Sequence, residues 1–443
     1  MAPSITPTVG ELLRESAAFY GARPALLEKT ADGYEEISYV GLLAEAEALA
    51  AALAARLAPD TRVLIVGKNS YDLLLAYFAA ALCASVSVPA DESLSPTELT
   101  AVAEDCGTTA VLYADARAEA VAALSMQIAL PFSVFPSLIL EGNALIDSEG
   151  YLSPTVDPDA TATILASGKS GRVALSHRLI GEMLMKHSRT QRISERDRFF
   201  TVLPAAHVLC MLPCVLFPLS CGAAVAFGEG MHTLLADMRQ VAPTQMVTVP
   251  FLAEEMLKKY RQTVSENSIE AVLRRAAART PTAAGRIVRE HLPDTLRHLF
   301  GGKLCRILTV GAPLEDALHE EWRRIGVMTV QSDGFLRLLN GEASGASDEE
   351  ADATHRTEAE FLLCQHPLVR EAAVIRVPVE GETEAIAVLM SEADEAEMTR
   401  WLQAVNDALP DREQVALFTL RSTPLPRCAD GTVDREAVAR ELA

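Results

Sequence analysis

Short apolar runs alternate with Ala- and Leu-rich segments of helical periodicity along most of the chain, and this alternation constrains the fold more than any other feature. The pattern predicts strands at 61–67, 85–90 and 110–114, with helices at 69–83 and 95–106 between them. Buried strands that alternate with helices over short connections form βα units on a largely parallel sheet. We therefore predict an α/β fold with a large domain of parallel βα units.

The regions on either side of this segment extend the pattern. Before it we expect a helix over 8–20 with Thr8 as N-cap, then a hairpin of two short strands that turns at Asp32-Gly33. After residue 178 the alternation returns and continues to residue 332. The strands expected there are 199–204, 223–227, 245–249, 306–311 and 327–332, with helices at 179–187, 234–241, 251–260 and 314–325.

The composition changes after residue 338. Residues 340–356, NGEASGASDEEADATHR, are small and acidic and contain almost no large apolar side chains, which is typical of a linker. The chain then resumes with helices expected at 357–366 and 395–408 and strands at 372–377, 384–390 and 415–420, a pattern that suits a small α+β domain. We predict three parts: a large N-terminal domain over 1–338, an acidic linker over 339–356, and a C-terminal α+β domain over 357–443.

Charge limits the partners of this chain. It has 443 residues and a net charge of −21, so a phosphate backbone would repel it unless it carried a strong local basic patch. The densest basic stretch has arginines at near-helical spacing between 274 and 289, which is typical of a solvated helix face. We therefore expect no nucleic-acid partner.

Cysteine usage and the apolar segments predict a cytoplasmic protein. None of the eight cysteines belongs to a CxxC pair, and the N-terminus lacks a basic region followed by an apolar one, so we expect no signal peptide. Residues 202–227 are apolar and long enough to span a bilayer, but Pro204, Pro213 and Pro218 would break such a helix. We expect a buried helix followed by a strand there, and no membrane span.

Residues 161–177, TATILASGKSGRVALSH, contain the clearest candidate site. An apolar run breaks into a Ser-Gly-Lys-Ser-Gly loop, and such loops cradle phosphates when they follow a strand. A Walker loop is not indicated, because Thr163 stands where that motif has a glycine. A turn without a ligand is the alternative. The candidate nucleotide-binding residues are Ser167, Gly168, Lys169, Ser170 and Gly171.

Several motifs together resemble the adenylate-forming enzymes: acyl-CoA synthetases, non-ribosomal peptide adenylation domains and luciferase-like ligases. The segments that carry the resemblance are ISYVGLLAEAEALAAAL (37–53), VGKNSYDLLLAYFAAALCASVSVPAD (66–91), SGKSG (167–171), LPAAH (203–207), VGAPL (310–314), HPLVREAAVIRVP (366–378) and LPRCADGTVDRE (425–436). The resemblance implies a small-molecule carboxylate as substrate and, if the chain is a working ligase, ATP or AMP and Mg²⁺ as cofactors; no cofactor is assigned otherwise. A thiol, often that of coenzyme A, then takes the acyl group.

The resemblance also implies roles for individual residues. His207 of LPAAH matches a position near the acyl carboxylate, and Gly311, Ala312 and Pro313 match the loop that packs on the adenine. A core histidine is the alternative reading of His207. His207 also begins an H-x2-C-x3-C-x6-C series with Cys210, Cys214 and Cys221, but Pro213 interrupts that helix, and we predict no metal site.

Other family positions are altered. The Pro-Lys-Gly of the family's phosphate loop is missing, so Arg172 is followed immediately by the VALSH segment. Arg337 occupies the position of the glutamate that helps to hold Mg²⁺, and Thr432 that of the lysine that stabilises the adenylation transition state. The aspartate that binds ribose and the hinge before the last domain have no counterpart. Losing one such charge typically costs ~10²–10³ in rate.

Two functional hypotheses follow. The first is a shortened, divergent member of this superfamily with little or no adenylating activity, which keeps a ligand pocket for a binding or accessory role beside a carrier protein or a biosynthetic enzyme. The second is a working AMP-forming ligase in which Lys169 or Arg172 supplies the missing charge. Whether the chain is an enzyme is therefore left open at this point, and no catalytic residue is assigned.

Overall fold

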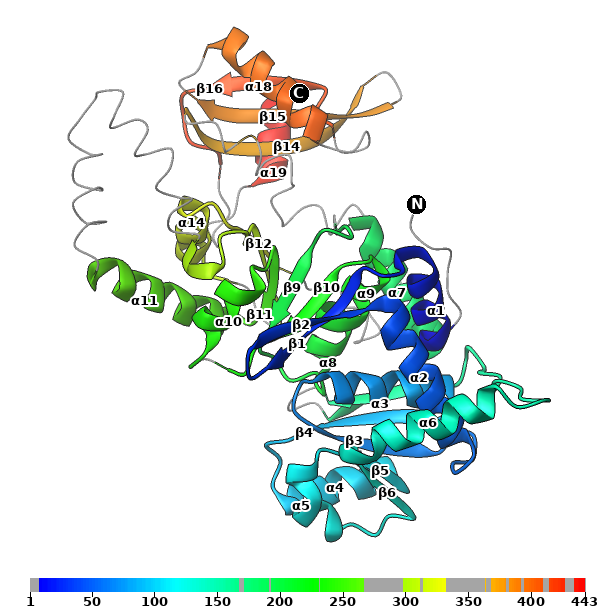
Figure 1. Cartoon of the computed structure of the whole chain (residues 1–443). Coiled ribbons are helices and arrows are strands. Elements are labelled where there is room, and N and C mark those ends of the chain that lie inside the picture. The colour runs from blue at the N-terminus through cyan, green and yellow to red at the C-terminus, as the bar shows by residue number, and fades with distance from the viewer. Residues whose placement is uncertain are drawn as a thin grey trace. The chain divides into compact units, whose positions relative to one another are not determined.

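The computed structural model describes most of the chain. The described residues are 8–166, 171–190, 193–230, 232–266, 298–310, 314–331, 363, 368–379, 382–391, 394–408, 414–426 and 434–442. The chain divides into two compact units, Met1–Gly341 and Glu342–Ala443, whose elements can be followed by colour in Figure 1.

A helix and a hairpin open the larger unit, as the sequence predicts. Helix α1 spans Val9–Tyr20, and Thr8 caps it because its Oγ1 accepts a hydrogen bond from a backbone N–H of the first turn at 3.1 Å. Strands β1 (Pro24–Thr30) and β2 (Gly33–Ser38) pair antiparallel, with the turn one residue before its predicted position. Helix α2 (Tyr39–Ala54) follows directly.

A seven-stranded sheet of the larger unit has the order β13-β12-β11-β9-β10-β1-β2. Its neighbouring strands are parallel, except for the β1–β2 hairpin. The strands not yet given, each within one or two residues of its predicted start, are β9 (Arg198–Thr201), β10 (Ala224–Phe227), β11 (Gln245–Thr248), β12 (Arg306–Thr309) and β13 (Met328–Gln331).

Helices from the second half of this unit pack on one face of the seven-stranded sheet (Figure 1). They are α10 (Leu234–Val241), α11 (Pro250–Glu266) and α14 (Asp316–Arg324). Phe200 and Met246 of the sheet share a core with Leu257 and the fully buried Trp322 of these helices. The predicted helical stripes therefore point at the sheet, as amphipathic helices require.

A second, six-stranded sheet has the order β6-β5-β3-β4-β7-β8 and is parallel except for the pair β7–β8. Its strands are β3 (Arg62–Gly67), β4 (Val86–Asp91), β5 (Ala110–Tyr113), β6 (Ile128–Pro131), β7 (Thr161–Ala166) and β8 (Arg172–Ser176). The segment after the glycine loop is thus the second strand of a hairpin. Its helices are α3 (Tyr71–Leu82), α4 (Pro96–Cys106), α5 (Ala118–Ala122), α6 (Phe135–Ile146) and α7 (His177–Thr190).

One hydrophobic core joins the two sheets. Helix α3 is buried on all sides from Leu73 to Leu82, so it has no polar face at all. Its side chains share a cluster with Leu26 and Val225 of the seven-stranded sheet and with Ile65 of the six-stranded sheet. The carboxyl ends of strands from both sheets are therefore held in fixed positions relative to each other.

The long apolar segment is a buried helix followed by a strand, as predicted. It comprises α8 (Val208–Cys210), a π-helical turn (Met211–Leu216) and α9 (Phe217–Ser220), and β10 comes next. Pro213 lies within the π-helical turn, where the interruption of the regular helix accommodates a residue without an N–H. In the part of the chain that the structure describes, no helix combines the length and apolarity needed to cross a bilayer.

The smaller unit is an α+β sandwich on a three-stranded sheet, β14-β15-β16. Strands β14 (Val369–Val379) and β15 (Glu382–Ser391) form an antiparallel hairpin, and β16 (Leu417–Arg421) pairs parallel to β15. Helix α18 (Glu395–Ala408) packs on one face and α19 (Arg435–Leu442) on the other. The predicted α/β fold with a small α+β part is confirmed, whereas the helix expected at 357–366 lies outside the described residues except for residue 363.

Candidate functional site

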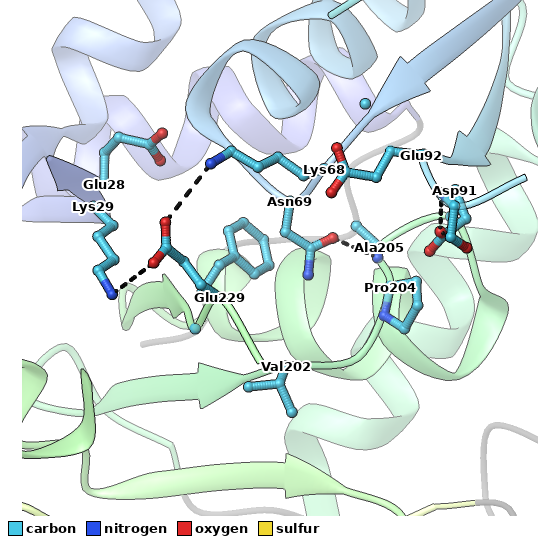
Figure 2. A pocket seen from close by; sticks show the side chains of 15 residues that line it. Glu28, Lys29, Lys68, Asn69, Asp91, Glu92, Val202, Pro204, Ala205 and Glu229 are labelled. Atoms are coloured by element: carbon cyan, nitrogen blue, oxygen red, sulfur yellow. Dashed lines mark hydrogen bonds and ion pairs between the residues drawn. The ribbon is translucent and has the colours of Figure 1, made fainter. Parts of the chain in front are cut away.

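The carboxyl ends of strands from both sheets meet around one cavity of about 380 Å³ (Figure 2). Residues at or just beyond the ends of β3, β4, β9 and β10 line it, together with two residues from the second half of β1. In open α/β sheets, ligands bind outside the carboxyl ends of the strands. The place of this cavity in the topology therefore makes it the candidate site.

The loop between β3 and α3 is the structural centre of the cavity. Gly67 ends β3, and a Cβ there would lie 2.9 Å from the ring of Phe132, so no larger residue fits without displacing that ring. Asn69 then bridges the two sheets: its Nδ2 donates to the carbonyl of Leu203 at 2.7 Å, and its Oδ1 accepts from the N–H of Ala205 at 2.8 Å. Asn69 thereby positions the 203–207 loop.

Glu28 places a carboxylate in the cavity at the N-terminus of α3. Its Oε2 accepts the backbone N–H of Tyr71 at 3.0 Å, which is the first N–H of that helix. Burial raises the pKa of Glu28 to about 7, and the nearby Asp72 adds to the increase, while the Tyr71 N–H and Lys68 act in the opposite direction. Burial therefore moves the ionisation of Glu28 from the acidic range towards neutral pH.

Lys29, the next residue of β1, anchors the opposite wall. Its Nζ contacts Oδ1 of Asp237, which is 1% exposed, and lies 3.0 Å from Oε2 of Glu229. The hydrogen bond with Asp237 is the main reason that the pKa of Lys29 is raised. Thr233 Oγ1 also donates to Asp237, at 2.6 Å. Lys68 reaches the other oxygen of Glu229 at 3.8 Å, as the dashed line in Figure 2 shows.

The end of β4 supplies further carboxylates. Asp91 closes a local turn, since its Oδ1 accepts from the backbone N–H of Ser93 at 2.8 Å and from the Ser93 hydroxyl at 2.5 Å. Glu92 follows it and is exposed along the rim of the cavity. Both side chains are labelled in Figure 2; Asp91 is the last residue of β4, and Glu92 is the first residue after it.

His207 follows directly after the lining residues Pro204, Ala205 and Ala206. It is half-buried, burial lowers its pKa, and its backbone N–H donates to the carbonyl of Pro204 at 3.0 Å. The assignment of His207 to an acyl carboxylate thus stays a prediction, although its loop forms one wall of the cavity.

The predicted nucleotide-binding residues lie largely outside the described part of the chain. This holds for Ser167, Gly168, Lys169, Ser170, Gly311, Ala312 and Pro313, and also for Arg337 and Thr432. Gly171 is described, with a φ of 95°, a conformation that favours glycine over residues with a Cβ. Arg172 forms an ion pair with Asp105 of α4, so its charge is directed at that carboxylate.

The cysteines of the possible soft-metal series are thiols packed in the core. Cys210 and Cys214 are fully buried, and the Cys210 Sγ donates to the carbonyl of Leu203 at 3.1 Å. Among the described residues, no group of three or more His, Cys, Asp or Glu side chains is placed to hold a metal ion.

Sequence reasoning missed most of the residues that line the cavity. Glu28, Lys29, Asn69, Asp91 and Glu229 were not selected as candidates, although Asn69, Asp91 and Glu229 lie one or two residues beyond the end of a predicted parallel strand. The positions just after each predicted parallel strand were the available signal, because such ends converge in α/β sheets.

Comparison with known proteins assigns the fold to a family. A family model described as AMP-binding enzyme matches residues 13–333. The long-chain-fatty-acid–CoA ligase FadD13 of Mycobacterium tuberculosis is 23% identical to this chain over 459 residues, which cover 88% of this chain and 90% of the relative.

Solved structures of adenylate-forming enzymes have the same fold. A fatty acyl CoA synthetase of Mycobacterium tuberculosis superposes with a TM-score of 0.55 at 16% identity, covering 98% of both chains. The anthranilate CoA ligase AuaEII in complex with anthranoyl-AMP gives a TM-score of 0.58 at 14% identity, covering 99% of this chain and 98% of the ligase. These likenesses extend over both units.

Proposed function

The chain belongs to the AMP-binding enzyme family, and on this premise we propose that it is a member with little or no adenylating activity, whose cavity serves a binding or accessory role. The sequence feature that carries the proposal is a reversal of charge that the motif resemblance implies. By that resemblance Arg337 takes the position of the glutamate that helps to hold Mg²⁺, and a guanidinium beside a divalent cation is strongly unfavourable.

A second altered position supports the same conclusion. By the same resemblance Thr432 takes the position of the lysine that stabilises the adenylation transition state, and a threonine hydroxyl carries no charge. Losing one preorganised charge typically costs ~10²–10³ in rate, and two such losses would remove most of the acceleration, even though their effects do not simply add.

The comparison with FadD13 supports a shortened chain. The alignment has 459 positions, yet it includes only 88% of the 443 residues of this chain. Many residues of the relative are therefore aligned with gaps in this chain. This chain therefore lacks segments that the relative has, in keeping with the missing Pro-Lys-Gly stretch and the missing region beyond residue 340.

The ion pair between Arg172 and Asp105 further weakens the ligase alternative. Arg172 was one of two residues expected to replace the lost charge of the phosphate loop, and Asp105 neutralises it. An active ligase that activates a carboxylic acid with ATP and Mg²⁺ stays the second candidate, because FadD13 is itself a CoA ligase and aligns over most of its length.

The proposed ligand and partner follow from the family. Members act on small-molecule carboxylates and pass the acyl group to coenzyme A or a carrier domain, so a small carboxylate or acyl group is the proposed ligand and a carrier protein or biosynthetic enzyme the proposed partner. The proposed adenine contacts are Gly311, Ala312 and Pro313, the proposed phosphate contacts Ser167 to Gly171, and the proposed acyl contact His207.

Pyrophosphate release tests the proposal. The full chain is incubated with ATP, Mg²⁺ and a panel of carboxylic acids, beside Thr432→Lys and a Thr399→Lys control, which adds the same charge at an exposed position of the same unit. We expect no release from the wild type or the control. Release by the wild type with any acid would contradict the proposal, whereas calorimetric binding of AMP without release supports it.

A further inference from the structure

Two of the segments that carry the family resemblance, 66–91 and 203–207, meet at the side chain of Asn69. Its Nδ2 donates to the carbonyl of Leu203 at 2.7 Å, and its Oδ1 accepts from the N–H of Ala205 at 2.8 Å, the bond that a dashed line marks in Figure 2. Both hydrogen bonds have the ordinary length. The proposed function gives the second segment a role through its last residue, but it leaves the first segment without one.

Asn69 is itself held in place on both sides along the chain. Gly67 ends β3 just before it and packs so closely on Phe132 that a Cβ would lie 2.9 Å from the ring. Just after it, the N–H of Tyr71 donates to Oε2 of Glu28 at 3.0 Å, at the first turn of α3. The body of α3 is buried on all sides. The amide of Asn69 therefore projects from a fixed part of the backbone.

The 203–207 loop also has hydrogen bonds within its own stretch of chain. The N–H of Leu203 donates to Oγ1 of Thr201 at 3.1 Å, and the carbonyl of Leu203 accepts from the Cys210 thiol at 3.1 Å. Both of these partners belong to the same part of the chain as the loop, whereas Asn69 reaches it from the end of the other sheet. Asn69 therefore sets the position of the loop relative to the six-stranded sheet.

The position of the loop determines that of His207. The N–H of His207 donates to the carbonyl of Pro204 at 3.0 Å, and Pro204 lies between the two residues that Asn69 holds. The carbonyl of His207 accepts from the N–H of Met211 at 3.0 Å, in the helical segment that follows. His207 is thus bonded to the loop and to the helix, so a shift of the loop moves it. Its side chain is half-buried, and this burial lowers its pKa.

We propose that Asn69 is the positioning residue of the proposed acyl contact: its two hydrogen bonds hold the 203–207 loop so that the His207 imidazole keeps its half-buried place directly after the cavity wall. This role rests on the proposed function, which assigns His207 to an acyl group, and deepens it by adding a residue from the other sheet. Side chains that contact a ligand keep their geometry when the residues behind them are themselves fixed, and Asn69 meets that condition.

Histidine NMR of the full chain tests this role without a ligand. The chain has nine histidines, and a His207→Gln variant identifies the His207 signal by its loss. Two quantities are measured for that signal: its pKa, from a titration between pH 5.5 and pH 8, and its exposure, from the relaxation that an uncharged gadolinium chelate adds. His177 and His187 are internal controls, since burial lowers the pKa of each to about 4, below this range.

A residue that only stabilised the fold would leave His207 unchanged in the molecules that remain folded. We expect Asn69→Ala instead to raise the pKa of His207 towards its ordinary value of 6.5 and to increase its relaxation by the chelate, because the released loop exposes the imidazole to water. Asn406→Ala removes the same pair of hydrogen bonds in the smaller unit and should change neither quantity. An unchanged His207 in Asn69→Ala, or an equal change in Asn406→Ala, would overturn the inference.

Asn69→Asp gives a milder test that does not depend on how well Asn69→Ala folds. The aspartate keeps an acceptor for the N–H of Ala205 but places a negative oxygen against the carbonyl of Leu203, which repels it. We expect the chelate to relax His207 more than in the wild type and less than in Asn69→Ala. Relaxation is the readout for this variant because the new charge itself raises the pKa of a nearby histidine. Relaxation equal to that of the wild type would contradict the role of Asn69.

The two proposals fail separately. Pyrophosphate release by the wild type would overturn the loss of adenylation and leave the His207 measurements as they stand. An unchanged His207 in Asn69→Ala, in a chain that releases no pyrophosphate, would overturn the positioning role alone.

Discussion

Replacing Asn69 by alanine should destabilise the larger unit, because this side chain connects the loops of two sheets. The substitution leaves the N–H of Ala205, which is 1% exposed, without its acceptor, while the carbonyl of Leu203 loses Asn69 and keeps the Cys210 thiol as a donor. Each buried polar group that loses its partner costs about 1–3 kcal/mol. Since the Leu203 carbonyl keeps a donor and Leu203 is only half-buried, we expect a loss of about 1–3 kcal/mol in the free energy of unfolding.

The two tryptophans of the chain allow the measurement. Trp322 is fully buried in the larger unit and Trp401 belongs to the smaller one, so a Trp401→Phe background restricts the fluorescence to the larger unit. Urea unfolding followed by Trp322 then gives the stability of that unit, and Asn69→Asp, which keeps an acceptor but loses the donor, should give a smaller loss than Asn69→Ala.

The smaller unit offers a matched control. Asn406 makes the same pair of bonds there, because its Nδ2 donates to the carbonyl of Val415 and its Oδ1 accepts the N–H of Val415, both at 2.9 Å. Asn406→Ala should leave the Trp322 transition unchanged. If Asn69→Ala moves that transition no further than Asn406→Ala does, the role assigned to Asn69 is wrong.

Three further predictions concern the larger unit and use the same Trp322 transition. Burial lowers the pKa of His177 and of His187 from 6.5 to about 4. Between pH 6.5 and about pH 4 the unfolded state therefore binds more protons than the folded state, and the free energy of unfolding falls as the pH drops through this range. Each histidine should lower the free energy of unfolding by about 2 kcal/mol between pH 7 and pH 5, and His177→Asn should remove the part of this pH dependence that His177 contributes. Lys29→Met should lower the free energy of unfolding by about 3–5 kcal/mol, because it leaves the buried Asp237 charge without its lysine. If the Lys29→Met/Asp237→Leu double variant is no more stable than Lys29→Met, this account is wrong. Gly67→Ala should lower the free energy of unfolding by about 1–3 kcal/mol, because the added Cβ clashes with the ring of Phe132. A variant as stable as the wild type would show that the ring moves aside without cost.

Local features of the fold could be predicted from sequence because they depend on neighbouring residues. The cap at Thr8 and the bounds of α10 and α18 match the predictions, and the hairpin turn at Ala31-Asp32 lies one residue before the predicted position. Residues 115–160 received no prediction. Helix α5 and strand β6 have only five and four residues and offer too few positions for a periodicity, whereas α6 has twelve residues and was missed.

The cavity could not be predicted to the same depth, because its contacts join residues that are far apart in the chain. Asn69 and Leu203 are separated by 134 positions, and Glu28 and Tyr71 by 43. The pattern of residues that are neighbours in the sequence cannot reveal such a pair unless the order of the strands in the sheets is known. Arg172 shows the same limit, since its sequence position pointed to a phosphate and its side chain pairs with Asp105.

The sequence by itself determined the class of the fold and the family. Alternating apolar segments bury at least one face of the helices and both faces of the central parallel strands, and each segment shows this requirement in its own residues. Only the tertiary structure decided which strand ends meet and which charges they bring together. Glu28, Lys29 and Glu229 acquire their pairings from the order of strands in two sheets, an arrangement that is set by the packing of α3 between them.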